Sequence, residues 1–197
     1  MNRVVNKYIL HNRSIFFEND DEVEQFLEKR RDENSKKHKQ PSSLNVKANL
    51  DKLSLGDMQV FRFNFRHESN NKILYLHGGY NTLQPSPFHW RFIDKLTLAT
   101  IHEVVLPIYP KAPDYHIEDT EKAVRDVYHQ LVDEVGAEHI IVMGDGSGGA
   151  LALNSKFSSR TTEGCNTCRF PRMFTESILI IATRSFIKRA VTCLSGL

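Results

Sequence analysis

Apolar and polar side chains follow two different periods along the chain from residue 58 onwards. The segment MQVFRFNF alternates apolar and polar positions, which predicts a half-buried strand. Three short apolar runs, each followed by glycine or proline, predict buried strands: KILYLHGGY, HEVVLPIYP and EHIIVMG. The segments FHWRFIDKLTLAT, IEDTEKAVRDVYHQLVDEVG and GGALAL place apolar residues at helical spacing and predict three helices.

The order of these elements predicts an α/β fold. Strands that alternate with helices are typical of a mostly parallel sheet with helices on both faces. Ligands of such folds bind beyond the carboxyl ends of the strands. The segments HGGY and GDGSGG both follow predicted strands, so we expect these two glycine-rich turns to lie on the same rim.

The remaining segments suggest a division of the chain into three parts. ENDDEVEQFLEKRRDEN, acidic at its start and basic towards its end, predicts a helix, and SKKHKQPSS predicts a polar linker. We therefore expect a helix and linker over residues 1–50, the core over 51–153 and an atypical tail over 154–197. The core and its neighbours form one domain, as the length of 197 residues suggests.

Composition excludes several classes of protein. A net charge of +2 offers no basis for nucleic-acid binding, and no apolar run is long enough for a signal peptide or a membrane span, so we expect a cytoplasmic protein. The odd number of cysteines argues against a disulfide framework. Cys165 and Cys168 have CxxC spacing without a second pair, and we expect no metal.

The GDGSGG turn allows two kinds of chemistry. Gly144, Gly146 and Gly149 fit the phosphate-binding pattern G-x-G-x-x-G between a strand and a helix, which would make a nucleotide-binding module. The motif comes late in the chain, however, and no strand carrying an acid follows it. Alternatively, Ser147 in a sharp strand-to-helix turn is a nucleophile, and a glycine-rich loop supplies N–H donors to an oxyanion.

His77, Gly78 and Gly79, together with the later Gly-Asp-x-Ser-Gly-Gly, resemble the α/β-hydrolases of the hormone-sensitive-lipase type. LPIYPKAPDYHIEDTEKAV is also similar to the segment of that family before the nucleophile strand. The resemblance implies an α/β-hydrolase fold with a small N-terminal cap. It implies hydrolysis of short-chain carboxylic esters through a serine acyl-enzyme, with a small-molecule ester as substrate and without a cofactor. The residues to which it assigns roles are oxyanion donors Gly78, Gly79 and Gly148, motif residues His77, Gly144, Asp145 and Gly149, and pocket residue Tyr80.

The sequence departs from the family pattern in the turn itself. The family places its nucleophile at position 146, where this chain has Gly146, so Ser147 is a displaced candidate nucleophile. Tyr80 also replaces the third glycine of the oxyanion loop. In the family an acid and then a histidine follow the serine, but here the last aspartate is Asp145 and the last histidine is His139. We therefore expect impaired catalysis, or an inactive protein kept for binding or left as a remnant.

The tail over 154–197 does not continue the strand–helix pattern. We interpret it as the product of a shifted reading frame or as disordered, with the C-terminal strands missing; a genuine short variant with a divergent tail is the alternative. The strand IIVM would then lack a neighbour unless the tail pairs with it, and an exposed edge favours self-association. We expect low stability and solubility for the same reason.

Overall fold

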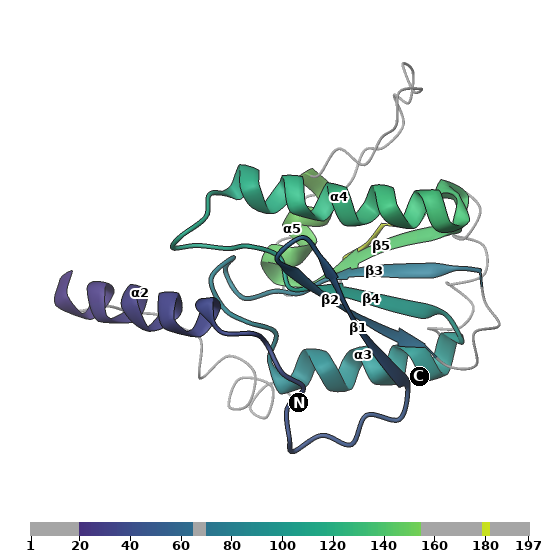
Figure 1. Ribbon diagram of the computed structural model, residues 1–197, viewed down its shortest axis with the longest axis horizontal. Helices are drawn as coiled ribbons and strands as arrows, with labels where there is room; N and C mark the ends of the chain where they lie inside the picture. The colour runs from purple at the N-terminus through teal and green to yellow at the C-terminus, as the bar shows by residue number, and fades with distance from the viewer. Residues whose placement is uncertain (1–19, 65–69, 155–178, 182–197) are drawn as a thin grey trace, which may run out of the picture.

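The computed structural model describes residues 20–64, 70–154 and 179–181, which form a sheet between helices (Figure 1). The sheet has the order β1-β2-β4-β3-β5-β6. Its strands are β1 (Asn49–Leu55), β2 (Met58–Asn64), β3 (Lys72–Leu76), β4 (Glu103–Pro107), β5 (Ile140–Gly144) and β6 (Leu179–Ile181). The helices are α2 (Asp20–Ser35), α3 (Pro87–Thr100), α4 (Ile117–Val135), the 3₁₀ turn η2 (Ala137–His139) and α5 (Gly146–Asn154).

The predicted α/β fold is confirmed, and its sheet is more mixed than the alternation of strands and helices indicated. At the centre β3 runs parallel to both β4 and β5, and Leu74 lies opposite Val105 and Val142. The strands β1 and β2 form an antiparallel hairpin, and β2 is also antiparallel to β4. The reason is local: only the turn Gly56-Asp57 joins β1 to β2, and the seven residues between β2 and β3 are too few for a crossover connection.

Helices cover both faces of the sheet, as expected (Figure 1). On one face α4 packs Val124, Val127 and Leu131 against the inward side chains of β3, β4 and β5. On the other face α3 packs Trp90 and Ile93 against a cluster that includes aromatic side chains of β2. The central strands β3 and β5 are buried along their whole length, which explains why their sequences read as continuous apolar runs.

Two strands lie outside the predicted set. The strand β1 is largely exposed, and its leucines at 50, 53 and 55 do not follow a period of two. In the tail, β6 pairs antiparallel with residues 142–144 of β5, so this part of the expected free edge has a neighbour. Self-association through the sheet edge stays a prediction. The other expectations for the tail, including those for Cys165 and Cys168, fall outside the described residues.

The predicted N-terminal helix is present as α2, and contacts at its end hold it to the core. Asn34 Nδ2 donates to the carbonyl oxygens of Thr82 and Ala112, each at 3.1 Å. Most residues of the following linker are exposed, and it contacts the core through His38: the indole Nε1–H of Trp90 donates to His38 Nε2 at 3.1 Å and the two rings stack. Of the helices in the described segments, none is long and apolar enough to cross a membrane.

Four charged side chains form a cluster, which we call the ion cluster, at the end of the central strands opposite the glycine-rich turns. Glu103 accepts hydrogen bonds from Arg62 Nε at 2.6 Å and from Lys72 Nζ at 3.1 Å. Glu134 of α4 pairs with the same two cations at 2.7 and 3.0 Å. Because the cluster joins β2, β3, β4 and α4, it fixes the helix to the sheet at this end.

Candidate functional site

The strand β5 ends and α5 begins within the GDGSGG turn, and the strained backbone position of this turn is Gly146. Its φ is +50°, in the left-handed region that side chains disfavour. A Cβ built on Gly146 has the Gly78 Cα at 3.8 Å as its nearest neighbour, which is an ordinary van der Waals contact. The site therefore has room for a side chain at 146. In a serine elbow, this strained position carries the nucleophile.

Other glycines of the turn are required by close backbone packing. A Cβ on Gly148 would overlap the carbonyl oxygen of Leu76, and one on Gly144 would lie 2.5 Å from the carbonyl oxygen of Gly148. Likewise, a Cβ on Gly78 would lie 2.5 Å from Asp145 Oδ2. The ends of β3 and β5 and the start of α5 thus meet backbone to backbone, and this contact brings the two glycine-rich turns together on one rim, as predicted.

The side chain of Ser147 turns towards the loop after β3. Its Oγ accepts a hydrogen bond from the backbone N–H of Asn81 at 3.2 Å. Three upstream histidines that are candidates for a base have other partners: His77 Nδ1 lies 2.8 Å from the Gly78 carbonyl, His139 Nδ1 lies 2.9 Å from Asn71 Oδ1, and the His116 backbone caps α4. The Ser147 hydroxyl therefore has a structural hydrogen-bond partner, and no histidine of the described residues hydrogen-bonds to it.

The N–H groups around the turn fall into two sets. Gly78 N–H donates to Asp145 Oδ1 at 2.9 Å, and Gly148 N–H donates to the Asp145 carbonyl at 2.8 Å. Within the described part of the chain, the N–H groups of Gly79 and Ser147 make no hydrogen bond. Two of the three predicted oxyanion donors are thus already used, and the N–H that follows position 146 is available instead. A hydroxyl at 146 would suit these free donors better than one at 147.

The loop after β3 is held in a strained form. Tyr80 and Asn81 have φ of 56° and 55°, which is uncommon for residues other than glycine. The carbonyl oxygen of Gly79 accepts from the N–H groups of Thr82 and Leu83, and the Asn81 carbonyl accepts from Ala112 N–H. Strain of this kind persists only where surrounding contacts over-determine it, and it is common at functional sites. The Tyr80 side chain is 58% exposed on this loop.

Asp145 connects the two turns. Its Oδ1 accepts from the Tyr75 hydroxyl at 2.7 Å and from Gly78 N–H, and its Oδ2 lies 3.2 Å from His89 Nε2. Burial by itself raises the pKa of Asp145, but the hydrogen bonds from His89, Tyr75 and Gly78 outweigh it and lower this pKa to about 2. The same carboxylate, together with burial, raises the pKa of Tyr75. Asp145 is therefore an ionised carboxylate with a structural role, because it links the two turns and α3.

His89 is the residue of this network that sequence reasoning missed. It is buried in the first turn of α3, and its Nδ1 accepts from Ser86 N–H at 2.9 Å while the Ser86 hydroxyl lies 2.8 Å away. A serine before a helix with a histidine three residues later suggests a helix cap. No local signal, however, links His89 to Asp145, which is 56 residues later in the chain.

His77 is packed beneath the loop after β3. Its ring is fully buried and stacks on Tyr109, with centroids 4.7 Å apart and planes 8° apart. The Tyr109 hydroxyl donates to the His77 carbonyl. Burial and the nearby charge of Lys111 hold the pKa of His77 well below its ordinary value, so the ring is neutral. These contacts make His77 a packing residue under the loop.

The GDGSGG turn is not suited to binding a phosphate. The N–H groups of Gly148 and Gly149 already donate to the Asp145 carbonyl, and the ionised Asp145 carboxylate lies beside the same turn. A phosphate-binding loop needs these N–H groups free and no anion nearby. The described residues also contain no group of three or more His, Cys, Asp or Glu side chains that could hold a metal ion.

Comparison with known proteins identifies the architecture. The model of a family described as alpha/beta hydrolase fold matches residues 73–184, more than half of the chain. The chain belongs to this alpha/beta hydrolase family. It is 70% identical to a "putative esterase" from Staphylococcus aureus, with a TM-score of 0.73, covering 77% of this chain and 52% of that one. It is 22% identical to the HSL homologue EstE7 from a metagenome library, with a TM-score of 0.50, covering 68% and 51%.

A curated relative agrees with this assignment. The chain is 30% identical over 97 residues to a triacylglycerol lipase of Mycobacterium tuberculosis, covering 49% of this chain and 22% of the lipase. The alpha/beta hydrolase chain described here thus spans about half the length of the solved structures and about a fifth of the lipase. The resemblance to the hormone-sensitive-lipase type is confirmed, with relatives named as esterases and lipases.

Proposed function

We propose that this chain is built for carboxylic-ester hydrolysis through a serine acyl-enzyme. We also propose that its own activity is impaired, because no histidine or aspartate follows the turn as a triad requires and because Gly146 stands at the nucleophile position. The observation that carries the proposal is the geometry of the turn. The strained φ of +50° belongs to Gly146, while Ser147 Oγ accepts from Asn81 N–H at 3.2 Å. In an acyl-enzyme mechanism the hydroxyl must reach the ester carbonyl while backbone N–H groups stabilise the oxyanion. Gly146 has no hydroxyl to offer.

The free N–H groups support the same proposal. Gly79 and Ser147 carry N–H groups without hydrogen bonds to the described residues, and they directly follow Gly78 and Gly146, which lie close together. These two N–H groups are the candidate donors to an oxyanion. Ser147 remains the displaced candidate nucleophile, but its hydrogen bond to Asn81 turns it towards the loop, and a misplacement of about 1 Å already costs roughly 100-fold in rate.

We also propose that α2 and the linker act as part of a cap over the site. Asn34 ties the end of α2 to Thr82, within the strained loop, and to Ala112. Arg31 of the same helix pairs with Asp114 at 3.0 Å. Tyr80, exposed on the same loop as Thr82, is the residue that we assign to the substrate pocket.

The test compares turnover of p-nitrophenyl acetate by three chains: wild type, Ser147→Ala and Gly146→Ser. We expect the wild type to turn over no faster than Ser147→Ala, because the hydroxyl at 147 is misplaced. We expect Gly146→Ser to exceed both, since it places a hydroxyl at the strained position beside free donors, but only modestly, because the variant still lacks a histidine base. Turnover in the wild type that is lost in Ser147→Ala would instead establish Ser147 as the nucleophile. Equal rates in all three chains would contradict the proposed ester chemistry.

A further inference from the structure

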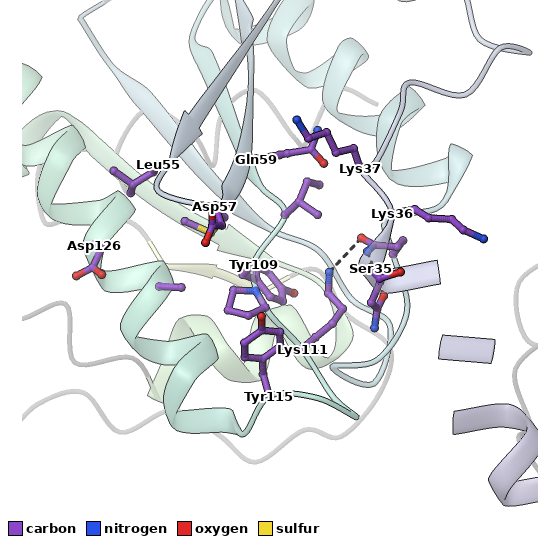
Figure 2. Close-up of a pocket in the computed structure, with 16 residues that line it drawn as sticks. Ser35, Lys36, Lys37, Leu55, Asp57, Gln59, Tyr109, Lys111, Tyr115 and Asp126 are labelled. Atoms are coloured by element: carbon purple, nitrogen blue, oxygen red, sulfur yellow. Dashed lines mark hydrogen bonds between the residues drawn. The ribbon is translucent and has the colours of Figure 1, made fainter. Parts of the chain in front are cut away.

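A cavity of about 390 Å³ lies apart from the two glycine-rich turns. Its walls come from the end of α2 and the residues that follow it, the β1–β2 hairpin, Gln84 of the loop before α3, the segment after β4 and the first turns of α4 (Figure 2). No residue of the GDGSGG turn or of the His77-Gly78-Gly79 segment lines it. Its size lies within the range typical of small-molecule sites. The catalytic chemistry proposed above makes no use of it.

Lys111 is the unusual group in this cavity. The residue is 2% exposed, and Figure 2 shows its side chain beside Tyr109, whereas Lys36 extends away from the cavity. The Lys111 Nζ donates to Gln84 Oε1 at 3.1 Å and lies 5.0 Å from the centre of the Tyr109 ring. Among the described residues, no carboxylate lies within ion-pair distance of this Nζ. A buried ammonium is normally paired with an anion, so an anion bound in the cavity would stabilise the charged form of Lys111.

The polar wall beside Lys111 is fixed in place. Gln84 Nε2 donates to Asn34 Oδ1 at 3.0 Å, and this bond directs Gln84 Oε1 towards Lys111. Asn34 is itself held by its two bonds to backbone carbonyls. Met58 and Ile108 also line the cavity and offer apolar surface. A ligand that fits this arrangement has a charged end for the ammonium and an apolar end for these two side chains.

We propose that this cavity binds a small aliphatic monocarboxylate, whose carboxylate pairs with Lys111 and whose alkyl chain packs against Met58 and Ile108. The single buried cation matches a single negative charge. Asp57 and Asp126 also line the cavity, and their carboxylates disfavour a dianion such as a phosphate monoester. The proposal does not depend on the GDGSGG turn, so its test is independent of the test of ester hydrolysis.

Binding of this kind has a protonation signature. Burial lowers the pKa of Lys111 to about 7, so the amine is only partly charged at neutral pH. An adjacent carboxylate favours the charged form and raises this pKa. The bound state therefore holds more protons than the free protein near pH 7, and carboxylate binding takes up protons.

The test is calorimetric titration of the full chain with hexanoate at pH 7 in two buffers of different ionisation enthalpy. We expect saturable binding with proton uptake, and much weaker binding of hexanol. Lys111→Met should weaken hexanoate binding by about tenfold or more, because it removes a charge-assisted hydrogen bond in a buried site. Lys37→Met is the matched control, since Lys37 lines the same cavity but is exposed. It should leave the affinity within about twofold.

A second variant keeps the test decisive if Lys111→Met does not fold. Gln84→Glu preserves the shape of the side chain and brings a carboxylate to the Lys111 amine, so it should compete with hexanoate and weaken its binding. The proposal is wrong if hexanoate does not bind the wild type, if hexanol binds equally well, or if neither Lys111→Met nor Gln84→Glu changes the affinity. Equal loss in Lys37→Met would also contradict it, because the site would then sense surface charge only.

Discussion

Replacing Asp145 by asparagine tests whether the carboxylate between the two turns holds them together. Asp145 accepts hydrogen bonds from Tyr75 and Gly78 and is paired with His89, and its side chain is 26% exposed. Its pKa falls from 3.8 to about 2 in the folded protein. Since each pKa unit is worth about 1.4 kcal/mol, the ionised carboxylate contributes about 2 kcal/mol to the free energy of unfolding. Asp145→Asn should lose this amount at pH 7.

The pH dependence gives the prediction its sign. The folded pKa lies below the unfolded value, so the stabilisation is complete above about pH 5 and is lost as the pH falls through 2. Urea denaturation of wild type and Asp145→Asn should therefore differ by about 2 kcal/mol at pH 7 and by about half as much at pH 3. Asp57→Asn, an exposed carboxylate in the β1–β2 turn, is the control and should show no such difference. A difference that stays constant between pH 7 and 3 would refute the electrostatic origin.

Two further variants test the packing that positions the site, each measured by urea denaturation at pH 7. Glu103→Gln should cost about 2 kcal/mol, since it removes charge-assisted hydrogen bonds from Arg62 and Lys72 and leaves them paired with Glu134, whereas Glu121→Gln in the looser surface pair with Arg125 should cost below about 0.5 kcal/mol; equal costs would contradict the role of the ion cluster. Trp90→Ala should cost about 4 kcal/mol because the ring is fully buried against Phe61, while Phe88→Ala, 58% exposed on the same helix, should cost below about 1 kcal/mol. A loss below about 1 kcal/mol in Trp90→Ala would show that α3 does not depend on this contact.

The sequence predicted the elements between residues 58 and 153 because each has a clear period and an end signal. Buried strands such as β3 read as apolar runs, and Gly136 ends α4 where the periodicity stops. The placement of both glycine-rich turns on one rim followed from the parallel order of the central strands. The fold class could therefore be predicted without the structure, and the family model confirms it.

What the sequence did not predict depends on contacts between distant residues. The contact of His89 with Asp145 spans 56 residues, and the packing of His38 on Trp90 spans 52. The strand β1 was missed because a mostly exposed edge strand carries little apolar pattern. The cavity around Lys111 is lined by residues of five separate segments, and no local sequence motif indicates such a site.

In the candidate site, too, local sequence predicted some features, and others depend on contacts between distant residues. The family pattern indicated that Gly146 stands at the nucleophile position, and the φ of +50° at this residue agrees with that interpretation. Only the structure shows that Ser147 is oriented towards Asn81 and that the N–H groups of Gly78 and Gly148 donate to Asp145. Whether Ser147 can act as a nucleophile stays a prediction for experiment.

Fluorophosphonate labelling, with the modified residue located by mass spectrometry, tests most directly whether position 146 is the nucleophile position. The comparison uses wild type, Gly146→Ser and Gly56→Ser; Gly56 has a similar φ of +58° but lies in the β1–β2 turn with open space around it. Both substitutions carry the same backbone strain, so only Gly146→Ser should gain reactivity. We predict labelling at residue 146 at least about tenfold faster than at Ser147 of the wild type. Labelling of wild-type Ser147 at an equal or faster rate would contradict the assignment of the nucleophile position to 146.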